Sequence, residues 1–221
     1  MPATKNETSA RLIEGVGSFL QRFNEIGDDL KTKQQEWEET EAQHFNIFRV
    51  LRIDRRETKL HSRFLAELLS PSGPHSQGRR FLDAFLEMGK KIGLDCPSER
   101  PKNLVWEIFT EEVIKKGRLD IVVRCQQARF IMAIENKIDA GERDNQLSDY
   151  DDWLDDQDAQ FKNLVFLTPD GREPNSISKT KCICLSYRDH ISDWLKQALS
   201  EIKAPKLKWA VEQYQQVVEE L

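Results

Sequence analysis

Three charged residues interrupt two apolar segments in the middle of the chain. Asp120 lies inside the run 119–123, and Glu135 and Lys137 end a run that begins at Phe130. An apolar pattern predicts buried strands here, and a buried charge is costly unless it is paired. Two carboxylates and an amine on neighbouring strands could bind a divalent cation and act on a phosphate ester.

The pairing of these strands predicts that the two carboxylates meet. If a hairpin turn is centred within 127–128, residues whose numbers sum to 255 lie opposite each other, so Asp120 faces Glu135. Opposed Cβ atoms are about 4.5–5.5 Å apart, and two carboxylates there repel unless one is protonated or a cation lies between them. Strand alternation puts Lys137 on the face of Glu135 and Asn136 on the other face.

Hard oxygen ligands of this kind favour Mg²⁺, with Mn²⁺ as a substitute, over zinc. We therefore predict that Asp120 and Glu135 are metal ligands and that Lys137 orients the attacking water or offsets charge at phosphorus, an arrangement suited to phosphodiester hydrolysis. A second interpretation is that Glu135 and Lys137 form only an ion pair at a strand end.

Three short motifs accompany these residues. They are Gly-Arg-Leu-Asp-Ile at 117–121, Ile-Glu-Asn-Lys-Ile at 134–138 and Gln-Leu-Ser-Asp-Tyr at 146–150. Over about 57–167 the chain resembles the PD-(D/E)XK nuclease superfamily, in particular a branch of uncharacterised bacterial proteins with an Ile-Glu-Asn-Lys strand. The resemblance implies that Asp120, Glu135 and Lys137 are catalytic and that the carboxylates hold Mg²⁺. Leu119 stands where the superfamily name has proline, a frequent replacement.

Gln146 and Tyr150 are four residues apart and therefore share a helix face. They resemble the Gln-x-x-x-Tyr motif of the RecB and lambda-exonuclease side of the superfamily, which implies that they support the active site and the substrate backbone. The alternative is a packing stripe of Leu147, Tyr150 and Leu154, with Gln146 beside it.

An upstream helix adds two candidate residues, Glu57 and His61, four positions apart. The resemblance implies that either could be a third metal ligand or hold a water molecule. A structural, hydrogen-bonded histidine is the alternative for His61.

Charge is unevenly spread along the chain. The segment 49–63 holds six basic residues against two acidic ones, a local surface that could follow phosphates. The expected nucleic-acid contacts are Arg52, Arg56, Lys59 and Arg118. In contrast, 142–158 holds eight acidic residues and one basic residue, so these acids must point away from Gln146 and Tyr150 if a polyanion binds there.

Overall composition limits the other function classes. A net charge of −5 over 221 residues excludes a histone-like DNA binder. The short apolar runs predict no membrane segment, and the polar amino-terminal stretch suggests a cytoplasmic protein with reduced thiols. The four cysteines lack C-x-x-C spacing. Glycine-rich phosphate loops, G-x-S-x-G and H-E-x-x-H are also absent, which leaves the acidic cluster as the feature with a mechanism.

The elements that must position this cluster follow from periodicity. Helices are expected at 9–41, 45–69 with a break near 54, 78–92, 143–155, 191–202 and 207–221, and strands at 104–114, 119–125, 130–138, 163–168 and 181–186. This order predicts an α/β fold, a restriction-endonuclease-like mixed sheet flanked by helices with an amino-terminal helical segment. We expect that segment to span 1–41 and a nuclease-like domain to span 42–221, with its core at about 104–200.

The predicted function is a metal-dependent nuclease that hydrolyses nucleic-acid phosphodiester bonds, with DNA as the expected partner. The resemblance also implies a role in defence against foreign DNA. The alternative is an inactive member of the same fold that binds nucleic acid or protein. The amphipathic helix at 9–41, with its acidic end at 36–41, could form a homo-oligomer or a partner surface.

Overall fold

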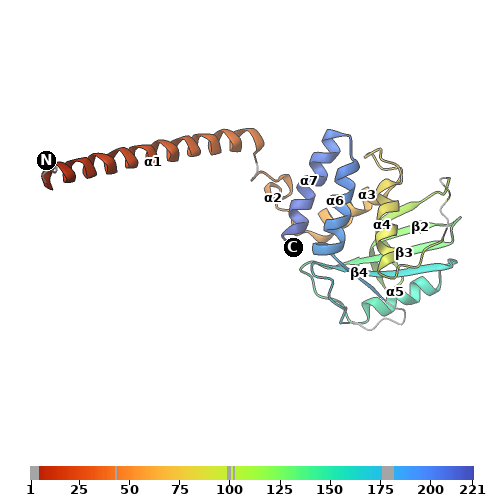
Figure 1. Ribbon diagram of the computed structural model, residues 1–221. Helices are drawn as coiled ribbons and strands as arrows, with labels where there is room; N and C mark the ends of the chain where they lie inside the picture. The colour runs from red at the N-terminus through yellow and green to blue at the C-terminus, as the bar shows by residue number, and fades with distance from the viewer. Residues whose placement is uncertain (1–4, 43, 99–100, 102, 176–181) are drawn as a thin grey trace. The chain divides into compact units, whose positions relative to one another are not determined.

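A five-stranded sheet forms the centre of the larger part of this protein. In the computed structural model the strands are β1 (Glu107–Ile114), β2 (Gly117–Cys125), β3 (Phe130–Asn136), β4 (Phe161–Thr168) and β5 (Ile183–Ser186), and they lie side by side in that order (Figure 1). β1, β2 and β3 pair antiparallel, whereas β4 and β5 continue the sheet in parallel with β3. The predicted mixed α/β fold is confirmed.

The structure describes residues 5–42, 44–98, 101, 103–175 and 182–221; the predicted start of the last strand, Lys181, lies outside them. Two compact units divide the chain, Met1–Phe45 and Asn46–Leu221. The described part of the first unit is dominated by one helix, α1 (Lys5–Glu41), of 37 residues. Within the described ranges, no helix combines the length and the apolar character needed to cross a bilayer.

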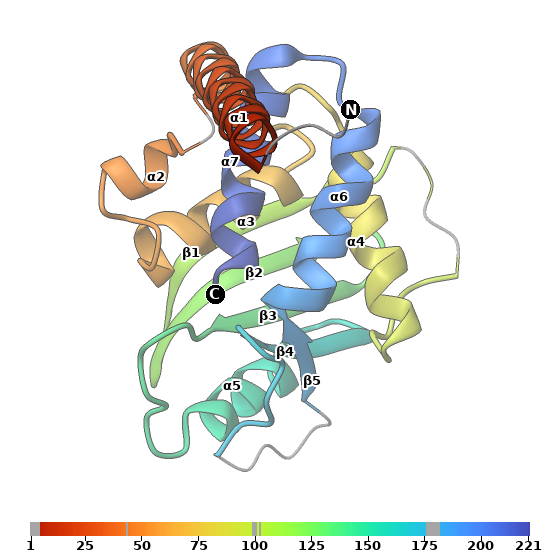
Figure 2. The same ribbon diagram turned by 60° about the vertical axis from the view of Figure 1, so that its left-hand side comes forward.

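Helices of the second unit cover both faces of the sheet, with α5 on one face and α3, α4, α6 and α7 on the other (Figure 2). The helical elements are α2 (Ile47–Val50), the π-helical η1 (Glu57–Ser62), α3 (Arg63–Leu69), α4 (Arg80–Lys91), α5 (Gln146–Asp155), the π-helical η2 (Tyr187–Ile191), α6 (Ser192–Glu201) and α7 (Pro205–Glu219). Because both faces are covered, all seven residues of β3 are buried. Coverage of both faces explains why this strand reads as a continuous apolar run.

Strand alternation divides the apolar side chains between the two layers. Ile121 and Ile134 belong to the large core under α3, α4, α6 and α7. Val122 and Ala133 belong to the smaller core under α5. Asp120 and Glu135, one position away from Ile121 and Ile134, therefore project toward the α5 face of the sheet.

The hairpin between β2 and β3 has the predicted register. Its described pairs run from Ile121 opposite Ile134 to Cys125 opposite Phe130, and each pair sums to 255. The next rung in this register holds Asp120 and Glu135. The apolar pattern and the polar turn were therefore sufficient to align the two strands.

The predicted helix at 45–69 is divided into three pieces. The side chain of Asn46 caps α2 by accepting from the N–H of Phe48. Arg52 then takes a left-handed backbone conformation with a φ of 55°, which ends the helical path. The chain re-enters helical structure at η1, where the candidate residues Glu57 and His61 lie.

Candidate active site at the open end of the β2–β3 hairpin

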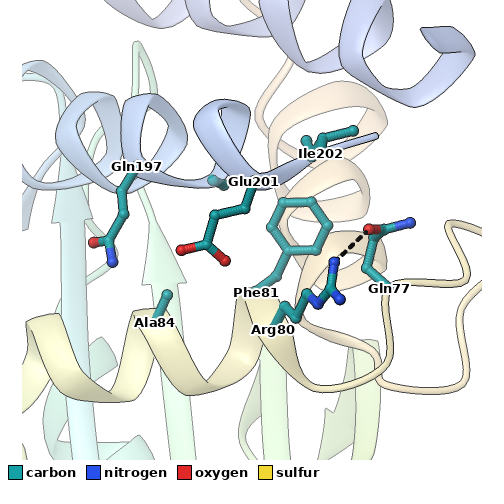
Figure 3. A pocket seen from close by; sticks show the side chains of 8 residues that line it. Gln77, Arg80, Phe81, Ala84, Gln197, Glu201 and Ile202 are labelled. Carbon is teal, nitrogen blue, oxygen red and sulfur yellow. Dashed lines mark hydrogen bonds between the residues drawn. The ribbon is translucent and has the colours of Figure 1, made fainter. Parts of the chain in front are cut away.

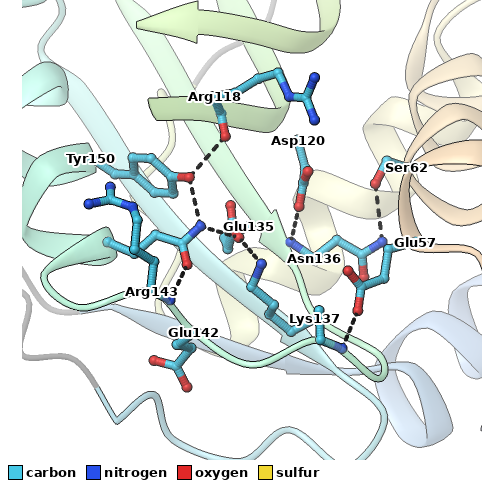
Figure 4. Close-up of polar contacts among 12 residues, drawn as sticks. Glu57, Ser62, Arg118, Asp120, Glu135, Asn136, Lys137, Glu142, Arg143 and Tyr150 are labelled. Atoms are coloured by element: carbon cyan, nitrogen blue, oxygen red, sulfur yellow. Dashed lines mark hydrogen bonds and ion pairs between the residues drawn. The ribbon is translucent and has the colours of Figure 1, made fainter. Parts of the chain in front are cut away.

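The two carboxylates lie at the open end of the β2–β3 pairing, Asp120 within β2 and Glu135 next to the last residue of β3 (Figure 4). Glu135 is 1% exposed, whereas Asp120 is only partly buried. The Oδ2 atom of Asp120 accepts a hydrogen bond of 2.9 Å from the backbone N–H of Asn136. This bond ties the Asp120 carboxylate to β3, directly beside Glu135.

The two oxygens of Glu135 have different surroundings. Oε1 accepts from the Nε2 atom of Gln146 at 2.6 Å and forms an ion pair of 2.6 Å with the Nζ atom of Lys137. Oε2 is buried and has no hydrogen-bond partner in the described part of the chain. A buried carboxylate oxygen without a partner is costly, so this atom requires a proton or a cation.

The pKa values reflect this crowding. Burial, together with the neighbouring Asp120 carboxylate, raises the pKa of Glu135 to about 7, although Lys137 opposes the shift. Burial also raises the pKa of Asp120. Burial alone would lower the pKa of Lys137, but the carboxylates of Glu135, Asp120 and Glu57 together outweigh it and raise the pKa. Lys137 is therefore a cation at neutral pH, while Glu135 is poised between two protonation states.

Helix α5 brings the Gln-x-x-x-Tyr pair to the carboxylates. The Nε2 atom of Gln146 also donates to the hydroxyl of Tyr150 at 2.8 Å, and that hydroxyl donates to the carbonyl of Arg118 at 2.9 Å. Tyr150 is at the same time 1% exposed and packed with Leu147 and Leu154 in the smaller core. Helix α5 therefore packs through Leu147, Tyr150 and Leu154 and also places Gln146 beside Glu135.

Glu57 anchors the loop that follows the candidate lysine. Its Oε1 atom accepts from three consecutive backbone N–H groups, those of Ile138, Asp139 and Ala140, at 2.7, 3.0 and 2.9 Å. Its negative charge also acts on the pKa values of Asp120 and Lys137. The residue joins the site, with one of its oxygens already engaged by the loop.

His61 does not join the carboxylates. It is fully buried, with Nδ1 3.0 Å from the hydroxyl of Tyr214 and Nε2 2.7 Å from the carbonyl of Asp54. Its ring also packs edge-on against Tyr187. Because both ring nitrogens already have partners, the expectation that His61 holds a metal or its water does not fit, and the structural alternative does.

The four expected nucleic-acid contacts are exposed but lie in different places. Arg56 and Lys59 line an open hollow with Glu57 and Asp139, between η1 and the loop after β3. Arg118 lies on β2, with an ion pair of 3.1 Å to Glu111.

Sequence reasoning missed two other arginines. Arg55 holds Asp139 through two hydrogen bonds, and Arg143 donates to the carbonyl of Lys116 and to Asp149. Each joins segments far apart in the sequence, so no local motif marked it.

Several acidic side chains of 142–158 are paired with cations. Asp149 contacts Arg143 at 2.8 Å and Lys116 at 3.2 Å, and Lys116 also lies 3.5 Å from Asp152. Glu142 contacts Arg172 at 2.7 Å. These pairs reduce the negative charge that an approaching polyanion would meet beside Gln146.

The donor set fits a hard divalent cation. Asp120 and Glu135 supply carboxylate oxygens, one of them buried and without a partner. Within the described ranges, no group of three or more His, Cys, Asp or Glu side chains forms a metal cage. Two carboxylates are the usual protein contribution to a Mg²⁺ site, since Mg²⁺ keeps several waters and binds substrate phosphate.

A separate pocket lies between α4 and α6 (Figure 3). It is lined by apolar side chains such as Phe81 and Ile202 and by the charged residues Arg80 and Glu201. Arg80 donates to Gln77 at 3.5 Å. Since the lining includes neither carboxylate of the β2–β3 site, this pocket is not part of it.

Comparison with known proteins gives one family match. The family model described as the PD-(D/E)XK nuclease superfamily matches residues 45–216, which include the whole sheet and the carboxylate site. No curated protein and no solved structure matches the chain significantly.

Proposed function

We propose, because this chain belongs to the PD-(D/E)XK nuclease superfamily, that it is a Mg²⁺-dependent nuclease that hydrolyses phosphodiester bonds of DNA. The observation that carries the proposal is the Oε2 atom of Glu135, which is buried without a partner in the described structure and shares a rung of the hairpin register with Asp120. A structural ion pair with Lys137 accounts for Oε1 alone. A divalent cation held by both carboxylates accounts for the other oxygen as well.

Each side chain then has a defined task. Asp120 and Glu135 hold the cation, which when bound polarises the phosphoryl oxygen and offsets charge on the leaving group. Lys137, protonated and oriented by Glu135, positions the attacking water and stabilises negative charge at phosphorus. Gln146 and Tyr150 fix the Glu135 carboxylate from the α5 side.

The basic residues beside the site mark a path for the phosphate backbone. Arg56 and Lys59 are exposed around the hollow next to Glu57, and Arg118 is exposed on β2. Arg52, exposed after α2, is the fourth expected contact. Such contacts position the strand without reading its bases.

The decisive experiment measures DNA cleavage in Mg²⁺ and Mn²⁺ by the wild type and by Lys137→Ala. We expect a loss of about 100-fold or more, since the amine acts on developing charge. Lys203→Ala, at an exposed position after α6, is the matched control and should keep full activity. Equal cleavage by the wild type and Lys137→Ala would refute the catalytic assignment.

A metal soak provides a readout other than activity. Crystals exposed to Mn²⁺ should show anomalous density between Asp120 and Glu135, and Glu135→Gln should abolish it. Density at another place would remove the metal site from the proposal. Tight DNA binding without turnover in either metal would favour the alternative, an inactive binding member of the fold.

The biological part of the proposal is defence against foreign DNA by a cytoplasmic enzyme. Phage infection of cells that carry the wild-type gene should give fewer plaques than infection of cells that carry Asp120→Ala. Equal plaque counts would contradict the defence role without touching the nuclease assignment.

A further inference from the structure

The long helix α1 presents an apolar stripe to solvent. Seven large apolar side chains on it are half exposed or more: Val16, Phe19, Leu20, Phe23, Ile26, Leu30 and Trp37. All except Leu20 lie on alternating steps of three and four residues, and only Lys33 interrupts the series. Three successive heptads of this kind are the pattern of a coiled-coil seam.

We propose that α1 pairs with α1 of a second copy of this chain to form an antiparallel coiled coil. The stripe is too regular for scattered surface apolar residues, because it follows the 3.5-residue repeat that keeps one face against a partner helix. A partner with the same repeat is present in every solution of this protein, namely another copy of the chain. The orientation of the pair follows from the charges on and beside the seam.

Lys33 is a charged residue within the seam. In a parallel pair in register, Lys33 would face Lys33 of the second copy inside the seam. In an antiparallel pair that sets Phe23 against Ile26 of the second copy, Lys33 faces Val16 near the end of the apolar segment, where its amine reaches water. The ammonium also keeps its ion pair of 2.6 Å with Asp29 on the same helix.

Charged residues also flank the seam. The parallel arrangement sets Glu36 against Glu41 of the second copy, a repulsive contact. The antiparallel arrangement sets Arg22 against Asp29 of the second copy, and symmetry repeats this pair.

The net charges of the two halves of α1 also favour the antiparallel pair. Residues 5–22 hold three basic and two acidic residues, whereas 23–41 hold two basic and seven acidic ones. Only the antiparallel pair places the acidic half of one helix beside the more basic half of the other.

The first test measures the mass of the full-length protein by sedimentation equilibrium. We expect a dimer for the wild type and a dissociation constant about 100-fold higher for Phe23→Asp, which places a carboxylate at the centre of the seam. Asn24→Asp adds the same charge on the outer face and should leave the dimer intact. A monomeric wild type, or a Phe23→Asp variant with unchanged mass, would overturn the proposal. If the wild type is a monomer and its sedimentation coefficient in a velocity run falls on Phe23→Asp, the stripe packs within its own chain and the proposal is wrong.

The second test fixes the orientation by a charge-reversal cycle. Arg22→Asp and Asp29→Arg should each weaken the dimer by roughly fivefold, since each places like charges opposite one another in the antiparallel pair. The double variant restores the opposite charges and should recover affinity beyond the product of the single effects. Purely multiplicative effects would reject the antiparallel arrangement, because in a parallel pair these positions do not meet.

Discussion

The central feature at the residue scale is the asymmetry of the Glu135 carboxylate. One oxygen receives both an amide donor and a cation, from Gln146 and Lys137, while the other is buried with no partner in the described structure. The pKa of about 7 follows from burial and from the neighbouring Asp120. A proton can therefore occupy the second oxygen when no cation does, and the two compete for one place.

This competition predicts pH-dependent metal binding. Mn²⁺ affinity should rise about tenfold between roughly pH 6 and pH 8, because Glu135 must lose its proton to act as a ligand. Calorimetry in buffers of different ionisation enthalpy should detect about half a proton released per metal bound near pH 7. Glu135→Gln should abolish binding, whereas Glu201→Gln, near the α4–α6 pocket, should not change it. A pH-independent affinity would contradict the competition.

The raised pKa of Glu135 also determines how the free energy of unfolding of the metal-free protein changes with pH. The native state holds a proton on Glu135 that the unfolded chain has already lost, so the free energy of unfolding falls as pH rises from 4.5 to about 7. Metal binding at higher pH should offset that loss.

At the scale of elements, the hairpin was predictable and the η1 segment was not. The register of β2 and β3 follows from two apolar runs and a four-residue polar turn, all local information. The surroundings of His61 depend on Tyr214, which is 153 positions away, and on a π-helical turn that the sequence pattern does not predict. The sequence could therefore not predict the placement of His61, whereas it could predict that Asp120 lies opposite Glu135.

The sequence could predict only part of the role of Glu57, for the same reason. Its approach to the site was expected from the resemblance, but the three N–H groups it binds belong to a loop more than 80 positions later in the chain. Through these hydrogen bonds η1 holds the loop 138–140 that follows Lys137.

We predict that Glu57→Gln loosens this loop. A neutral amide oxygen accepts more weakly than a carboxylate, so the amides of Ile138, Asp139 and Ala140 should exchange hydrogen faster, and cleavage should fall by about tenfold as Lys137 loses its position. Glu87→Gln, on the exposed face of α4, is the matched control. Unchanged exchange at these three amides would show that Glu57 does not hold the loop.

The η1 segment should also make the fold sensitive to acid. Burial lowers the pKa of His61 from 6.5 to about 4, so the unfolded chain binds a proton that the native state excludes. The contribution of His61 to stability is then complete above pH 6.5 and is lost as pH falls toward 4, by about 3 kcal/mol in all, and its sign is opposite to that of the Glu135 contribution.

Urea unfolding of the wild type and His61→Gln at several pH values measures this contribution. The variant should be less stable at pH 7, because it loses bonds to Tyr214 and Asp54, yet its stability should fall less between pH 6.5 and 4. Parallel pH profiles for the two proteins would rule out His61 as the acid-sensitive group.

At the scale of the whole molecule, a net charge of −5 has to be reconciled with a polyanionic substrate. Overall attraction is excluded, so binding must come from local positive charge. The acids near α5 are partly paired with Lys116, Arg143 and Arg172, while Arg56 and Lys59 are exposed at the hollow beside Glu57. We therefore propose that the phosphate path runs on the η1 side of the site.

This assignment predicts a specific change in salt dependence. In a Lys137→Ala background that stops cleavage, replacing both Arg56 and Lys59 by Ala should lower the slope of log affinity for double-stranded DNA against log salt by about 2, since each lost phosphate contact removes about 0.9. Lys203 and Lys206, exposed near the start of α7, provide a control pair with the same charge change. If both pairs change the slope equally, only general electrostatics acts and the path beside η1 is refuted. A loss confined to the Arg56 and Lys59 pair instead places the DNA backbone next to the carboxylates that would cut it.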